Sequence, residues 1–282
     1  MIALTGANGQ LGRLVIDHLK KAGASGIRAL VRSPDKAQDL AGPAVSVVEA
    51  DYDKPGTLAA ALSGVDRLLL ISGSEIGQRT RQHKAVIDAA KEAGVSFIAY
   101  TSILNADTSP MILAREHRET EAALKASGIA HALLRNGWYL ENYIGTVAAA
   151  LEHGAVVGSS GSGRIAAASR SDYAKAAAAV LTASDLPSRT YELAGSTAFT
   201  LADMAAEISA RAGRDIPFNN LPADVYAGIL VQAGLPQGFA EILADSDTAA
   251  AGGALYSEST DLEKLIGHPT RTLTQFVQTQ IG

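Results

Sequence analysis

Three glycines at a spacing of three residues, Gly6, Gly9 and Gly12, stand near the start of the chain. A short apolar run, 2–4, leads directly into them, and an amphipathic helical pattern follows at once. Glycines in such a turn let a phosphate approach the backbone, and the free N–H groups of the following helix suit a pyrophosphate. The spacing predicts a dinucleotide-binding turn, with a plain glycine-rich turn as the alternative. The residues expected to bind the cofactor here are Gly6, Asn8, Gly9, Gln10, Leu11 and Gly12.

Arg32 follows a second expected strand, 27–31, about twenty residues beyond the last of these glycines. An Asp or Glu at this position of a dinucleotide-binding fold binds the ribose hydroxyls of NAD. Arginine instead offers a planar fork of donors that matches a phosphate. The sequence therefore favours NADP(H) over NAD(H) at this site, and no second motif for a flavin follows. The alternative is a solvated arginine at a strand end.

Polar residues also stand where the third and fourth expected strands end. Asp51 follows the strand 45–48 and is placed either to meet the adenine or to cap the next helix. The strand 67–71 runs into four residues that are expected beside the pyrophosphate and the nicotinamide ribose, because ligands bind at the carboxyl ends of such strands. They are Ser72, Gly73, Ser74 and Glu75.

A polar and aromatic corner follows the sixth expected strand, 129–135, and we expect it near the nicotinamide. It consists of Asn136, Gly137, Trp138 and Tyr139. Further along, Ser171 and Asp172 are expected to cap a helix over 173–183. Arg170, directly before them, is a candidate for a cofactor phosphate, or for a salt bridge to Asp172 or Glu141.

The candidate site residues stand at the ends of several strands, so they must belong to a fold that brings those strand ends together. Strand and helix patterns alternate through 2–193, which predicts an α/β fold, a Rossmann-type doubly wound parallel sheet. Helical patterns dominate beyond Gly195, at 201–212, 224–233, 239–250 and 261–266. We therefore expect residues 1–154 to form an NADP-binding Rossmann domain, its sheet completed by parts of 155–195. Residues 196–282 are expected to form a smaller, mainly helical substrate-binding C-terminal lobe.

Composition narrows the class of protein. The chain has 282 residues, 47% of them hydrophobic, a net charge of −5 and no cysteine. The acidic balance gives no reason to expect nucleic acid, and no stretch is long and apolar enough to span a bilayer. Because the first expected strand starts at Ile2, we expect no signal peptide, no membrane partner and a cytoplasmic protein. The six histidines are not spaced as metal ligands, so no metal is expected.

The glycine motif, Arg32, Asp51, the strand end 99–102 and the segment 134–139 together resemble the NmrA-like atypical short-chain dehydrogenase/reductase family. The resemblance covers essentially the whole chain. The segments 70–72, 77–79, 82–83, 107–110 and 265–270 are most similar to the bacterial flavin-free NADPH:quinone oxidoreductases, and the triphenylmethane reductases come next. This resemblance implies a Rossmann-type NADP domain, a small C-terminal lobe and a quinone in the cleft between them.

Ordinary short-chain dehydrogenases carry a catalytic tyrosine and, four residues later, a lysine. Aligned on Glu121, this chain has Leu113 and His117 at those positions. Hydride addition to a ketone builds an alkoxide that needs a proton donor in the transition state. The anion formed from a quinone can take its proton later from water. The missing pair therefore disfavours alcohol dehydrogenase and epimerase chemistry, and leaves easily reduced acceptors or a redox sensor without turnover.

Our mechanistic hypothesis is a direct hydride transfer from NADPH to a small-molecule quinone in a protein that is a monomer or homodimer. Asn136 is the candidate to fix the nicotinamide or the acceptor oxygen, and Tyr139 is the candidate donor to that oxygen. Trp138 and Tyr143 are candidates for a flat apolar wall, or are ordinary packing residues. His117 is a candidate proton relay or a structurally hydrogen-bonded histidine. His83 is expected to pack on a helix surface.

Overall fold

Seven parallel strands form the central sheet of the computed structural model, which describes residues 1–282. Their order is β3-β2-β1-β4-β5-β6-β8, so the chain starts in the middle, runs to one edge and then crosses to the other side. The strands are β1 (Ile2–Leu4), β2 (Ile27–Val31), β3 (Val45–Glu49), β4 (Arg67–Leu70), β5 (Phe97–Ile103), β6 (Ala130–Asn136) and β8 (Arg189–Leu193). This is the predicted Rossmann-type α/β fold, with its topological switch between β1 and β4.

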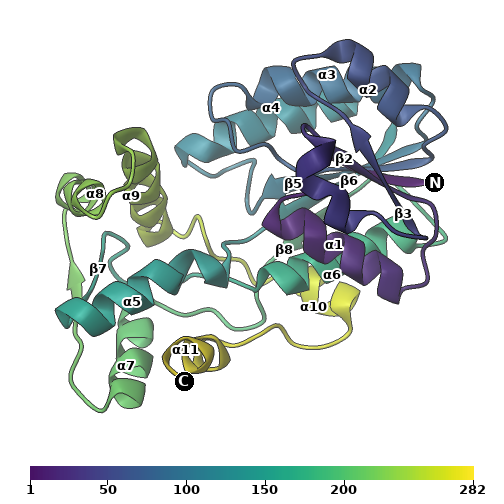
Figure 1. The fold of residues 1–282 in the computed structure, drawn as a ribbon. Coiled ribbons are helices and arrows are strands. Elements are labelled where there is room, and N and C mark those ends of the chain that lie inside the picture. Colours follow the sequence, from purple (N-terminus) through teal and green to yellow (C-terminus); the bar gives the residue numbers. More distant parts are fainter.

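Helices cover both faces of the sheet (Figure 1). One face carries α2 (Pro55–Leu62), α3 (Arg79–Glu92) and α4 (Ile112–Ser127). The other carries α1 (Gln10–Lys21), the 3₁₀ helix η1 (Pro34–Leu40), α6 (Arg170–Thr182) and α10 (Asp261–Ile266). Because both faces are covered, the strands are almost continuously apolar.

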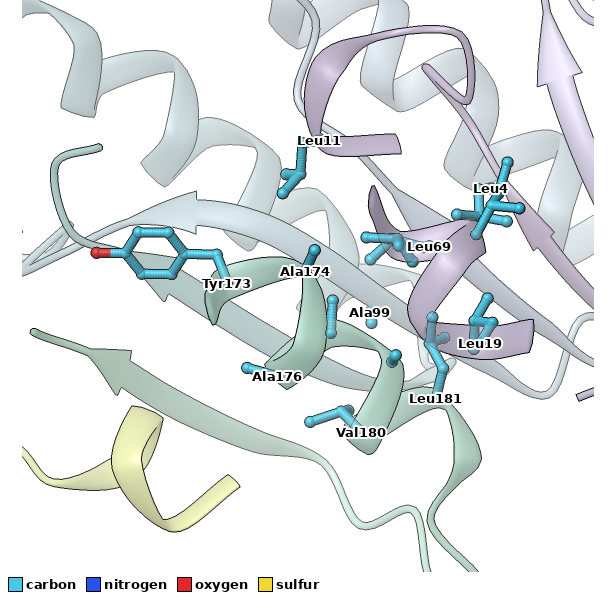
Figure 2. Packing of buried hydrophobic residues seen from close by; sticks show 14 of the residues in the cluster. Leu4, Leu11, Leu19, Leu69, Ala99, Tyr173, Ala174, Ala176, Val180 and Leu181 are labelled. Atoms are coloured by element: carbon cyan, nitrogen blue, oxygen red, sulfur yellow. The ribbon is translucent and has the colours of Figure 1, made fainter. Parts of the chain in front are cut away.

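The core beneath α1 and α6 shows why these two helices lie close together. Figure 2 shows Leu4, Leu69 and Ala99 of three neighbouring strands packed against Leu19 of α1 and Ala174 of α6. Half of the residues that α6 buries are alanines, whose small side chains let the helix approach both the sheet and α1. This packing holds the first turn of α1 against the end of β1.

The remaining elements form a lobe with its own core. They are α5 (Ile144–His153), α7 (Leu201–Ala212), α8 (Ala223–Gln232), α9 (Gln237–Ala251), α11 (Leu273–Ile281), and a two-stranded sheet of β7 (Val156–Gly158) and β9 (Phe218–Asn220). A 3₁₀ turn, η2 (Leu140–Tyr143), leads into it. No helix combines the length and the apolar character needed to cross a membrane.

The packing differs from the predicted division of the chain in two places. Helix α5 and strand β7 lie before residue 196, yet α5 packs with α7 and α11 in the lobe and β7 packs with α5 and α7. Helix α10, by contrast, packs on α6 and β8 of the sheet. Strands β7 and β9 and helix α11 were not predicted, and the two strands have only three residues each, which is too few for an alternating pattern to be recognised.

The N-cap of α6 lies two residues before the predicted cap, Ser171 and Asp172. The helix begins at Arg170, and Ser169 is its N-cap. The Ser169 hydroxyl accepts a hydrogen bond from the Asp172 N–H at 3.1 Å, and the Asp172 carboxylate accepts one from the Ser169 N–H at 3.3 Å. This reciprocal capping box places Asp172 inside the first turn rather than before it.

Candidate active site

One cavity of about 1430 Å³ follows the carboxyl ends of β1 to β6 and is bordered on its other side by α9. The carboxyl edge at a topological switch point is where open α/β sheets bind ligands. All sixteen residues predicted to bind the cofactor line this cavity, as do His117 and Tyr139. The structure therefore brings the predicted site residues together, while the contact that each makes with a ligand stays a prediction.

The glycine turn has the geometry of a phosphate cradle. Gly6 has a φ of +59°, which favours glycine. A Cβ at Gly12 would lie 2.4 Å from the Gly6 carbonyl oxygen, so any side chain there would force the turn apart. The backbone N–H groups of Gln10 and Leu11 have no hydrogen-bond acceptor in the protein. These free donors at the N-terminus of α1 fit a pyrophosphate.

Arg32 is paired across the cavity rather than solvated alone. Its Nη1 donates to Glu75 Oε1 at 2.7 Å, and Glu75 Oε2 accepts from Gln82 Nε2 at 2.9 Å. The Arg32 side chain is 69% exposed, so the guanidinium remains accessible to a phosphate. Asp51 does not cap α2, because the N-cap of that helix is Lys54. Instead, Oδ1 of Asp51 accepts a hydrogen bond from the Asp53 N–H at 3.1 Å in a local turn.

The loop that follows β4 is held from behind by His83. The Gly73 N–H donates to His83 Nε2 at 2.9 Å, so that nitrogen must be unprotonated. His83 Nδ1 then donates to Thr120 Oγ1 at 3.0 Å, and the Thr120 hydroxyl donates to the Glu116 carbonyl at 2.9 Å. His83 is fully buried and packs against α4, as the predicted packing on a helix surface requires. Burial, with the nearby Arg79 cation, lowers the pKa of His83 to about 4.

His117 and Leu113 lie one helical turn apart on α4 and line the same cavity. His117 Nδ1 shares a hydrogen bond of 2.8 Å with the Tyr100 hydroxyl. Burial, and then the charge of Arg79, lower the pKa of His117 to about 3. The ring is therefore neutral at physiological pH, which favours the structurally hydrogen-bonded histidine over the proton relay.

The corner after β6 depends on a glycine. A Cβ at Gly137 would lie 2.9 Å from both the Ala166 carbonyl oxygen and the Tyr173 hydroxyl. Asn136 Nδ2 donates to the Tyr139 hydroxyl at 3.3 Å, which leaves the proton of Tyr139 available for another acceptor. Burial raises the pKa of Tyr139, so the phenol stays protonated.

Near this corner, Arg170 forms the predicted alternative salt bridge and Tyr143 is the predicted alternative packing residue. Arg170 pairs with Glu141, with Nη1 at 3.6 Å from a carboxylate oxygen, and its guanidinium lies 4.7 Å from the centre of the Tyr139 ring. Tyr143 lies outside the cavity and packs edge-on against Phe199 in the lobe core, at 5.8 Å between ring centres. Trp138 lines the cavity and also packs against the lobe core.

A buried ion cluster anchors the corner to α4. Arg135 is 4% exposed and donates to Glu121, Asp107 and Glu192 at 2.6–2.9 Å. Burial opposes its charge, but these hydrogen bonds outweigh burial and raise the pKa of Arg135. The cluster ties the end of β6 to the helix that carries His117. This cluster could not be predicted from the sequence, because the three carboxylates lie far apart along the chain.

The apolar part of the cavity comes from both sides of the cleft. Ile103, Leu113 and Trp138 belong to the sheet side. Leu235, Phe239, Ile242 and Leu243, from α9 and the turn before it, face them. The i, i+3, i+4 spacing of the last three is a helical stripe that the sequence contained, but its placement over the sheet was not predictable from spacing. Such a wall suits a flat apolar ring.

Comparisons with known proteins point in the same direction. A family model described as NAD(P)H-binding matches residues 6–184. The chain is 54% identical to quinone oxidoreductase 2 of Escherichia coli (strain K12) over 278 residues, which is 98% of this chain and 97% of the relative. The structure of the NADPH-dependent quinone oxidoreductase QOR2 from Escherichia coli complexed with NADPH matches with a TM-score of 0.97 at 53% identity, covering 100% of both chains. The Citrobacter sp. triphenylmethane reductase complexed with NADP(H) matches with a TM-score of 0.94 at 39% identity, covering 99% of this chain and 100% of that one.

Proposed function

The chain belongs to the NAD(P)H-binding family, and from this premise we propose that it is an NADPH-dependent oxidoreductase that transfers a hydride directly to a quinone without flavin. The quinone is reduced by two electrons to the hydroquinone in one step. This assignment accords with the full-length similarity to a quinone oxidoreductase at 54% identity.

One observation carries the proposal. A single cavity joins the phosphate cradle of the glycine turn to an apolar wall, and the position of the usual catalytic tyrosine on that wall is occupied by Leu113. A flat acceptor can therefore stack inside the cavity that also takes the dinucleotide. An acceptor that needed a proton in the transition state would meet an apolar side chain there.

The bound dinucleotide supplies the hydride; the protein supplies binding, orientation and exclusion of water. The free N–H groups at the start of α1 bind the pyrophosphate, and Arg32 binds the 2′-phosphate. The apolar wall displaces water from one face of the acceptor. Asn136 orients Tyr139, and the Tyr139 hydroxyl, kept protonated by burial, donates to the acceptor oxygen.

A steady-state assay tests the function. Purified protein, NADPH and a panel of benzoquinones and naphthoquinones are followed by the loss of nicotinamide absorbance. Turnover is expected with at least one quinone and without added flavin. Gly12→Ala should abolish NADPH binding and turnover, because its Cβ would collide with the Gly6 carbonyl. Gly56→Ala is the matched control, since a Cβ there meets no atom within 4 Å.

The alternative is a sensor that binds NADP(H) and regulates a partner without turnover. Measurable NADPH binding with no turnover of any quinone or triarylmethane dye would establish that alternative and reject the enzyme. Turnover confined to triarylmethane dyes would instead assign the chain to dye reduction. We further expect a cytoplasmic protein that is a monomer or homodimer, which light scattering of the purified protein tests for its oligomeric state.

A further inference from the structure

Arg79, the first residue of α3, carries the one unpaired guanidinium of the cavity. Arg32 pairs with Glu75 and Arg170 pairs with Glu141, but no carboxylate lies within 4.0 Å of the Arg79 guanidinium. Its Nε donates to the Gly73 carbonyl at 2.6 Å, and its Nη1 is buried without any hydrogen-bond partner. Leaving a buried charged donor unsatisfied is costly, so this group is arranged for a partner that arrives from the cavity.

The acidic side chain whose charge acts on the Arg79 guanidinium, that of Glu116, does not meet this need. Glu116 directs Oε1 to the backbone N–H groups of Gly77 and Arg79, both at 3.1 Å, rather than to the guanidinium. The three carboxylates that line the cavity are each paired with another cation. These pairs are Asp51 with Lys54, Asp53 with Arg81, and Glu75 with Arg32.

Burial opposes the charge of the Arg79 guanidinium and lowers its pKa, and Glu116 is the one carboxylate whose charge counters this effect. Arg79 contributes to the lowered pKa of His117, which places its charge near the helical turn that carries His117 and Leu113. The apolar wall opposite contributes no carboxylate. A positive charge therefore acts on this end of the cavity through a medium of low polarity, where its effect on a nearby charge is large.

We propose that Arg79 selects acceptors that become anionic on reduction and disfavours acceptors that are cationic beforehand. The inference rests on the proposed function. Transfer of one hydride, with its two electrons, from NADPH to a neutral quinone gives NADP⁺ and the hydroquinone monoanion, which then takes one proton from water. Arg79 stabilises the anionic oxygen as it forms. A triarylmethane cation accepts the same hydride at its central carbon and becomes neutral, so Arg79 repels it on entry and does nothing for its product.

The test compares two acceptors in one protein. We measure kcat and KM for a naphthoquinone and for a cationic triarylmethane dye, together with the Kd for NADPH, in the wild type, Arg79→Gln and Arg79→Lys. Arg79→Gln should lower kcat for the quinone by about tenfold to a hundredfold, as loss of an oxyanion donor does. Turnover of the dye should stay unchanged or rise. Arg79→Lys should retain most of the preference, because it keeps the charge while losing the bond from Nε to Gly73.

Arg115→Gln is the matched control, since Arg115 is an exposed arginine of α4 that lies outside the cavity and pairs only with Glu119, which lies outside it too. An equal loss with both acceptors would overturn the inference, as would a loss explained by weaker NADPH binding, which would assign Arg79 to the cofactor. A preference lost equally in Arg79→Lys and Arg79→Gln would show that the bond to Gly73 matters rather than the charge. If the wild type reduces no quinone, it is the proposed function that fails.

Discussion

Replacing Arg32 by alanine is expected to weaken the binding of NADPH and to leave the binding of NADH almost unchanged. The guanidinium stands at the end of β2 with 69% of its side chain exposed and pairs with Glu75, whose side chain is 43% exposed. An ion pair this exposed contributes about 0–1 kcal/mol, so a phosphate can displace Glu75 at little cost. The structure thus leaves Arg32 available to the one group that distinguishes the two cofactors.

The expected magnitude follows from the kind of bond that is lost. A hydrogen bond to a charged group contributes about 1.5–3 kcal/mol, so Arg32→Ala should raise the Kd for NADPH by about 10- to 150-fold. Glu75→Gln removes the carboxylate that competes with the phosphate and should lower that Kd by up to about fivefold. In the double variant the gain from Glu75→Gln should disappear, because no guanidinium remains to be released.

Calorimetric titration of the four proteins with NADPH and NADH measures these effects. Arg189→Ala is the matched control, since Arg189 is an exposed arginine at the start of β8, outside the cavity. The Kd values for NADH should agree between the wild type, Arg32→Ala and Arg189→Ala. An equal weakening of NADPH and NADH by Arg32→Ala would refute the assignment of Arg32 to the 2′-phosphate.

Three further predictions concern buried groups. His83→Leu should weaken NADPH binding and lower Tm, because the partly buried N–H of Gly73 loses its acceptor, which costs about 0.5–1.5 kcal/mol. His83→Gln offers an acceptor again and should recover most of the NADPH binding and of the Tm. Equal losses in the two variants would contradict this prediction. His117→Ala should leave the pH profile of kcat unchanged between about pH 5 and 9, because the pKa of His117 is already lowered to about 3. A shifted profile would instead support a role of His117 as a proton relay. Burial raises the pKa of Asp247 from 3.8 to about 6. The free energy of unfolding of the wild type should therefore fall by about 3 kcal/mol as the pH rises from below 3.8 to above 6. Urea unfolding should show that loss in the wild type but not in Asp247→Asn, and parallel pH dependences would reject it.

Much of the fold was predictable because its signals are local. Apolar runs and helical spacing located all seven sheet strands to within three residues and placed α1 directly after the glycine turn. The close approach of Gly12 to Gly6 and the position of Arg32 at a strand end also follow from short spacings, since the carboxyl ends of parallel strands share one edge. Local patterns gave no such information for β7 and β9, which are three residues each.

The amino-acid sequence alone determined the fold class, the glycine cradle, the arginine at the end of β2 and the loss of the tyrosine and lysine pair. Only the tertiary structure decided that His83 is buried behind Gly73, that Arg32 meets Glu75 and that Arg79 has no carboxylate partner. The physical reason is that these states depend on groups 10 to 43 residues apart along the chain, brought into contact by packing. Residue types show which chemistry is available, whereas burial and neighbours set the charge that each group carries in the cavity.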